Sequence, residues 1–214
     1  MPGSGPGMSG IQIFVPIEWI ERQPQDRRAH WLTTQAVEIM QPFWATAGWG
    51  WILPEDGISG PDIEQPAMYP FTQRFPGIEV LDRVQMQSTD FSKATYSINW
   101  LNYLSDPLLD QLGGRESVKH RIEKKNATTD PEGSRLHWDE VGNCLLIVAG
   151  DGPGTGDVTQ GLGLPGYGLA ARLLKPVRVP RMVNIWVAPP PGGTRDKHTL
   201  QRANDAYLSR FDDF

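Results

Sequence analysis

The sequence predicts an α+β fold, with a mostly antiparallel sheet flanked by helices in a single domain. The expected elements run β-α-β, a long loop, β-α-α, β-β, α and β-α, so hairpins occur beside crossovers. The 214 residues suit one domain, and eight Trp with 39% hydrophobic residues supply a core. We therefore expect one domain over residues 11–214. A flexible tail, almost entirely Gly, Pro and Ser, is expected over residues 1–10.

The first elements are expected to be a strand and an amphipathic helix. Residues 11–19 alternate and are rich in β-formers, with Pro16 indicating an edge or a bulge. In the helix that follows, Asp26 is able to cap the start and Pro42 to bend or end it. The helical spacing predicts a core face made of Leu32, Ala36, Ile39, Met40 and Phe43.

A second strand and a long Pro-rich stretch come next. Residues 48–54 ("GWGWILP") alternate like a strand that places Trp49 and Trp51 on one side. Residues 54–77 carry five prolines, which predicts an irregular connection with at most one helical turn. Loops of that length tend to be functional, and the alternative is a surface segment stiffened by proline.

The middle of the chain predicts a central strand, two helices and a hairpin. Residues 94–104 alternate as a strand. A short helix begins at Pro107 and stops at Gly113, and another covers residues 115–125. Residues 134–150 are expected to form a hairpin with its turn near "EVGN".

The last third predicts a helix, a strand and a final helix. The helix begins at residue 166 and ends before Pro176, and the strand covers the apolar part of residues 182–193 before a polyproline stop. The final helix, over residues 195–211, carries an apolar face made of Leu200, Ala203, Tyr207 and Phe211.

A glycine-rich segment over residues 150–168 follows the hairpin and raises the question of nucleotide binding. It contains one formal dinucleotide fingerprint, Gly161, Gly163 and Gly166. A true fingerprint directly follows a strand, whereas about ten residues separate Gly161 from the strand that ends near Ala149. The chain also has no phosphate-loop "GK[ST]" sequence, so no nucleotide site is expected.

Other chemistry is not indicated by any motif. The histidines are scattered without metal-ligand spacing, at His30, His120, His137 and His198. Cys144 lies in an apolar strand and is interpreted as a core residue. Asp139 shares a strand face with His137 while Glu140 points away, and "EKK" at Glu123 falls at a helix end. We expect no catalytic residue, metal or cofactor; the alternative is an enzyme with a degenerate nucleotide or metal site.

Charge and hydropathy exclude two further classes of partner. The net charge of −5 and the pI near 5.4 argue against a nucleic-acid binder, which needs a basic stripe. No apolar run approaches the ~18 residues of a membrane span, and the first residues do not resemble a secretion signal. The expected compartment is the cytoplasm.

Four segments in a fixed order resemble the type VI immunity family. They are "RFPGIEV", "INWLNYLSDPLLDQLGG", "LLIVAGDGPGTGDVTQG" and "LPGYGLAARLLKPVRVP". The matching positions are Pro76 and Gly77, Trp100 to Leu104 with Gly113 and Gly114, Ala149, Gly150, Pro153, Gly156 and Asp157, and Tyr167 to Arg178. The resemblance covers about half the chain, residues 75–180, and "NATTDPEGSRLHW" departs from the family pattern.

The resemblance implies an antitoxin that catalyses nothing. Members of the family are similar to proteins that bind and silence a cognate type VI effector, notably nucleases of the VRR-NUC and restriction-endonuclease-like kind. The glycine-rich segment would then be a structural connection, whose glycines supply positive φ angles and close packing. Asp157 is expected to bond local backbone amides or to cap a turn.

An acidic part of the Pro-rich stretch is the expected docking site for a nuclease. Glu55, Asp56, Asp62 and Glu64 lie within ten positions that contain no basic residue. A nuclease presents a cationic groove to its substrate, which an acidic loop can occupy. Trp51 is the candidate aromatic anchor beside it, with a core position as the alternative. The alternative for the acidic residues is a solvated surface, and the oligomeric state is left open.

Overall fold

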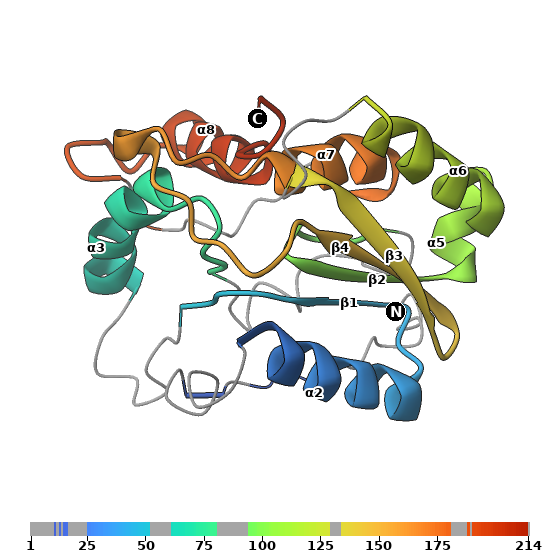
Figure 1. Ribbon diagram of the computed structural model, residues 1–214. Coiled ribbons are helices and arrows are strands. Elements are labelled where there is room, and N and C mark those ends of the chain that lie inside the picture. The colour runs from blue at the N-terminus through green and yellow to red at the C-terminus, as the bar shows by residue number, and fades with distance from the viewer. Residues whose placement is uncertain are drawn as a thin grey trace, which may run out of the picture.

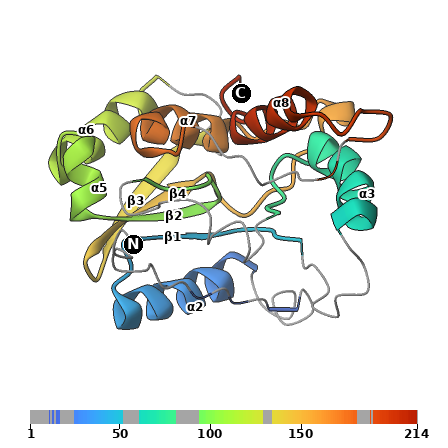
Figure 2. The same ribbon diagram turned by 180° about the vertical axis from the view of Figure 1, so that it is seen from behind.

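The computed structural model describes residues 11, 13, 15–16, 25–51, 61–80, 94–128, 134–180, 188 and 190–213. Their strands form one four-stranded antiparallel sheet in the order β1-β2-β4-β3. Figure 1 shows helix α2 on one side of this sheet and α6, α7 and α8 on the other, and the view from behind in Figure 2 agrees. The prediction of an α+β fold with a mostly antiparallel sheet is confirmed.

The sheet is built around two central strands. Its strands are β1 (Trp44–Ala47), β2 (Leu101–Ser105), β3 (Leu136–Val141) and β4 (Cys144–Ala149). Strand β2 is buried along its whole length and lies between β1 and β4, so the prediction of a central strand is confirmed, but residues 94–100 of the expected strand lie outside it. The hairpin of β3 and β4 is confirmed as well, because Val141 pairs with Cys144 across the turn at Gly142, whose φ is +56°.

The described helices cover both faces of the sheet and one of its ends. They are α2 (Gln25–Met40), α3 (Pro61–Arg74), α5 (Asp106–Gln111), α6 (Arg115–Asn126), α7 (Pro165–Leu174) and α8 (Lys197–Leu208), with the 3-10 turns η2 (Val158–Gln160) and η3 (Lys175–Val177). Local signals set several of the bounds. Pro107 lies in the first turn of α5, and Asp196 caps α8 by accepting hydrogen bonds from the amides of His198 and Thr199, each at 2.9 Å.

The main core lies between the sheet and its two helical layers. It includes Leu145, Leu146 and Ile147 of β4, which are fully buried. Cys144 is part of this core, and burial raises the pKa of its thiol to about 11. The interpretation of Cys144 as an inert core residue is therefore confirmed.

The predicted core face of α2 is wrong at Ile39 and Met40, although Phe43, just beyond the helix, packs against the core. Ile39 is 82% exposed and Met40 is exposed too, whereas Val37 is buried. Threonines lie on the inward side of the helix, where Thr34 contacts the Tyr103 hydroxyl and Thr33 donates its hydroxyl to the Ala29 carbonyl. A threonine that bonds its own helix backbone tolerates burial, so apolar spacing alone points to the wrong side.

Two predictions around the Pro-rich stretch are also wrong. The strand expected at residues 48–54 lies earlier, at β1, and Gly50 makes only an isolated parallel bridge to Glu79. The stretch itself contains the helix α3 rather than one helical turn, although Pro66 and Pro70 lie inside it. Each interior proline removes a helix hydrogen bond, and the burial of residues such as Met68 on the inward side offsets that loss.

Several expectations fall on residues outside the described ones. Of the predicted first strand, only residues 11, 13, 15 and 16 are described, and none of these four lies in a strand. The tail over residues 1–10 and most of the strand expected within residues 182–193 lie outside the description. The same holds for Glu55 and Asp56.

Candidate functional site

The glycine-rich loop between β4 and α7 is a tightly packed connection. Gly150, Gly156 and Gly161 have φ values of +87°, +66° and +68°, a region that favours glycine. A Cβ on Gly77 would lie 2.0 Å from the carbonyl oxygen of Gly154, so the two segments touch backbone to backbone. The expected structural role of these glycines is confirmed.

Asp157 organises the far end of this loop. Its carboxylate caps η2 by accepting a hydrogen bond from the Thr159 amide at 3.0 Å and another from the Thr159 hydroxyl at 2.6 Å. The Arg74 guanidinium of α3 donates to both carboxylate oxygens, with its Nη2 at 2.7 Å from Oδ2. The Arg74 hydrogen bonds, followed by those of Thr159, hold the pKa of Asp157 well below its usual value. The predicted capping role is confirmed, and the ion pair to α3 is a finding that the sequence did not indicate.

The two tryptophans after β1 connect this loop to the segment that follows α3. The Trp51 amide donates to the Glu79 carbonyl at 2.7 Å, and the Glu79 amide donates to the Trp49 carbonyl at 2.8 Å. The Trp49 indole Nε1 donates to the Pro153 carbonyl at 3.1 Å. The half-buried Trp51 ring packs against Phe71 of α3, with ring centroids 5.7 Å apart. Trp51 thus lies beside α3, a position that is compatible with the hypothesis that it anchors a partner near this helix.

A buried polar network holds the same segment against α8. The Tyr207 hydroxyl donates to the Glu79 carboxylate at 2.5 Å, and Arg210 Nη2 lies 3.4 Å from its other oxygen. Arg210 also donates to the Pro76 carbonyl at 2.9 Å. Burial raises the pKa of Tyr207 well above its usual value, so its hydroxyl stays protonated and donates. This network fixes the backbone on which the Trp51 segment rests.

Of the predicted acidic docking residues, Asp62 and Glu64 lie in α3, whereas Glu55 and Asp56 lie outside the described residues. Asp62 and Glu64 belong to the first two turns of α3. Positions two apart in an α-helix lie about 200° apart around its axis, so these two residues do not share a face. Position 64 lies on the side of Phe71, seven residues further on, whereas position 62 lies almost opposite.

Apolar side chains are exposed where α3 and η2 meet. Phe71 is 49% exposed, Val158 is 55% exposed and Leu162 is 58% exposed. Figures 1 and 2 show η2 beside α3, where Arg74 reaches Asp157. We call Phe71, Arg74, Val158 and Leu162 the α3–η2 surface. Sequence reasoning missed it because the prolines obscure the helical spacing of α3 and no local pattern pairs α3 with the loop.

Comparison with known proteins identifies the family. A family model described as "Type VI immunity for VRR-NUC" matches residues 2–211. The chain belongs to this family. Its description names the family as type VI immunity proteins for VRR-NUC effectors.

A solved structure shares the fold of this immunity protein. The T6SS protein PA0821 of Pseudomonas aeruginosa superposes with a TM-score of 0.66 at 22% sequence identity. The match covers 92% of this chain and 51% of that chain, so the immunity protein spans about half its length. At this identity the likeness shows the fold alone. No curated protein matches the sequence.

Residues that resemble catalytic groups have structural partners in the immunity protein. Glu140 is bound by Lys119 at 2.5 Å, which lowers the pKa of Glu140. Gly166 of the formal nucleotide fingerprint lies at the start of α7, where it packs against the backbone of Ala149. Within the described ranges, no three His, Cys, Asp or Glu side chains are grouped to hold a metal ion. No helix in the same ranges is both long and apolar enough to cross a membrane.

Proposed function

We propose that this immunity protein binds its cognate VRR-NUC effector directly, in the cytoplasm, and holds it inactive. The observation that carries this proposal is the family match, which extends over residues 2–211. A nuclease is inhibited most simply by covering the surface that receives its substrate. The surface that serves this purpose must be exposed and rigid before the partner arrives.

The α3 end of the molecule fits these requirements. The α3–η2 surface combines Phe71 and the half-exposed Arg74, whose residue types are enriched at protein interfaces, with the exposed apolar side chains of Val158 and Leu162. The ion pair of Arg74 with Asp157 and the hydrogen bond from the Gly77 amide to the Thr155 carbonyl, at 2.9 Å, hold α3 and the loop together. Little ordering is then needed on binding, which favours affinity.

The acidic residues near α3 supply charge complementarity to a nuclease. Position 64 lies on the Phe71 side of the helix, and Trp51 packs against Phe71. We infer that Glu64 faces the cationic substrate groove of the effector, with Trp51 supporting the contact. We include Glu55 and Asp56, which precede α3 in the chain, in the same proposed contact. Position 62 is left out because it lies on the side of α3 away from Phe71.

Substitution of the exposed apolar residues tests this docking site. We expect Phe71→Asp and Leu162→Asp each to weaken binding of the effector at least tenfold, because each places a charge in an apolar contact. Binding to the cognate VRR-NUC effector is measured by titration, and protection from its activity is measured by a nuclease assay.

A matched control separates this site from general surface effects. Ile39→Asp makes the same change at an exposed position of α2, and we expect it to bind like the wild type. In the same assay, Glu64→Lys is expected to slow association while Asp62→Lys leaves it unchanged. Wild-type affinity of both Phe71→Asp and Leu162→Asp would place the docking site elsewhere. No binding by the wild type would overturn the direct neutralisation itself.

A further inference from the structure

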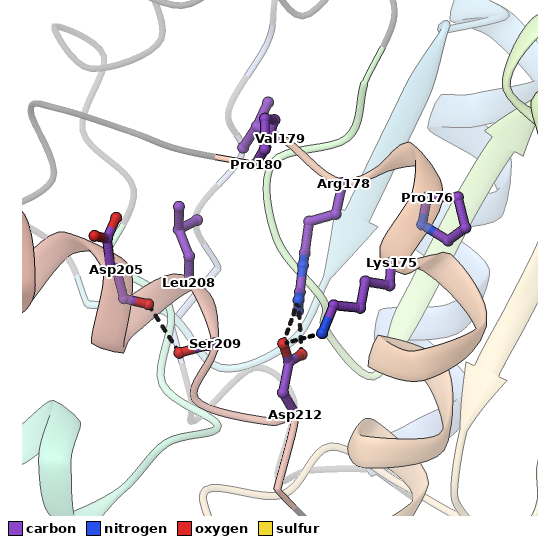
Figure 3. Close-up of a pocket in the computed structure, with 9 residues that line it drawn as sticks. All are labelled: Lys175, Pro176, Arg178, Val179, Pro180, Asp205, Leu208, Ser209 and Asp212. Atoms are coloured by element: carbon purple, nitrogen blue, oxygen red, sulfur yellow. Dashed lines mark hydrogen bonds and ion pairs between the residues drawn. The ribbon is translucent and has the colours of Figure 1, made fainter.

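A pocket of about 450 Å³ lies between η3 and α8, away from the α3–η2 surface. Figure 3 shows side chains from both elements around it. Lys175, Pro176, Arg178, Val179, Pro180, Asp205, Leu208, Ser209 and Asp212 line it. Its volume lies in the range of small-molecule and side-chain binding sites in proteins.

Arg178 is the buried cation of this pocket, and part of its guanidinium has no acceptor. Its side chain is only 7% exposed. Nη2 donates to both oxygens of Asp212, at 2.6 and 2.9 Å. Nη1 is also buried, yet it has no hydrogen-bond partner among the described residues. Leaving a buried charged donor without a hydrogen bond is unfavourable. An acceptor that does not belong to the described residues would therefore stabilise Nη1.

Lys175 adds a second cation at the mouth of the pocket. Its side chain is 66% exposed, and its Nζ lies 3.2 Å from Oδ2 of Asp212. Burial acts to raise the pKa of Asp212, but the hydrogen bonds and charges of Arg178 and Lys175 outweigh it, so the net shift is downward. Asp212 is therefore ionised at neutral pH and balances only one of the two cations. The second carboxylate of the lining, Asp205, lies on the opposite side of the pocket, so the excess positive charge is confined to the end formed by Arg178 and Lys175.

The remaining walls favour an apolar group next to that charge. Val179, Pro180 and Leu208 contribute the apolar part of the lining. Figure 3 shows Asp205 on the opposite side of the pocket from Arg178, where its carboxylate accepts a hydrogen bond from Gln201 at 2.6 Å. A ligand with its anionic end at Arg178 can therefore place its apolar body against Val179, Pro180 and Leu208, away from Asp205.

We propose that this pocket binds a carboxylate attached to an apolar body, with Arg178 Nη1 and Lys175 Nζ as its donors. Guanidinium and ammonium groups together bind carboxylates well. The planar guanidinium donates hydrogen bonds in fixed directions, and the ammonium adds a compact positive charge on a flexible side chain. Nη1 is covered in this structure, so binding includes a small movement of the Asp212 or Arg178 side chain. The carboxylate belongs either to a free small acid or to an acidic side chain of a bound protein.

Titration of the full chain with hexanoate tests the proposal. We expect saturable binding by calorimetry at low ionic strength, with a Kd on the order of 1 mM. Hexanamide, which has the same shape without the charge, is expected not to bind. Lys175→Gln should weaken hexanoate binding about fivefold, whereas Lys124→Gln, a matched change in the last turn of α6, should not affect it.

A substitution that is expected to tighten hexanoate binding distinguishes a binding site from a purely structural ion pair. Asp212→Asn removes the carboxylate that competes for both cations, so it should tighten hexanoate binding several-fold. If the pair is purely structural, Asp212→Asn should only lower the melting temperature, and neither the wild type nor the variant should bind hexanoate. The proposal is overturned if the wild type shows no saturable binding, if hexanamide binds equally well, or if neither Lys175→Gln nor Asp212→Asn changes the affinity.

A second probe distinguishes the two sources of the carboxylate. N-acetylglutamate N-methylamide presents the carboxylate as a protein side chain does. Binding of this probe in competition with hexanoate supports a protein ligand, whereas binding of hexanoate alone supports a free acid. Because neither titration contains the effector, the result does not depend on the proposed docking at the α3–η2 surface.

Discussion

Asp157 is the residue through which the glycine-rich loop keeps its shape. It caps η2 and accepts the ion pair from Arg74, and these donors lower its pKa. A carboxylate with a lowered pKa stabilises the fold fully above its unfolded pKa, near 3.9, and loses that contribution as the pH falls through the lower folded value. We expect Asp157→Asn to lower the Tm at neutral pH, with the difference from the wild type shrinking below about pH 4.

Thermal melts followed by circular dichroism between about pH 3 and 7 measure this difference. Asp151→Asn is the matched control, because Asp151 is an exposed acidic residue of the same loop. Its Tm should follow the wild type at every pH. If the difference caused by Asp157→Asn stays constant down to pH 3, ionisation of this carboxylate is not what stabilises the loop.

At the scale of the element, α3 and α8 show what a single sequence reveals about helices. Helix α8 was predictable because its capping Asp196 and its apolar spacing, from Ala203 to Tyr207, lie within the helix itself. Helix α3 was not, since Pro66 and Pro70 argue against a helix locally. The contacts that stabilise α3 come from distant segments, and no local pattern reports them.

The connection of α8 to the segment after α3 carries an element-scale prediction. Arg210→Met leaves the Glu79 carboxylate buried without its cation, and breaking a buried pair in this way costs about 3–5 kcal/mol. Urea unfolding should show a lower midpoint with an unchanged slope. The double variant Glu79→Gln with Arg210→Met should cost less than the sum of the two single changes. Strict additivity would show that the pair is not coupled.

For the whole molecule, the sheet was easier to predict than the candidate site. Alternation and the turn at Gly142 are local signals, and they led to the central strand and the hairpin. The candidate site depends on the pairs Arg74–Asp157 and Glu79–Arg210, which join residues 83 and 131 positions apart. Pairs of residues this far apart produce no recognisable short-range pattern in the sequence. The sequence therefore suggested the acidic residues as a hypothesis, but it did not indicate the exposed apolar side chains of the α3–η2 surface.

Hydrogen exchange on the complex tests the proposed docking across the whole fold. A partner that binds only the folded state stabilises it by mass action, by about 2.7 kcal/mol at a free concentration a hundredfold above Kd. Amides that exchange by local opening gain further protection only where the partner covers them. With the VRR-NUC effector added, we expect extra protection in residues 67–74 and 158–164 and none in residues 31–40. Extra protection of α2 or of β3 without any in α3 would move the interface away from the α3–η2 surface.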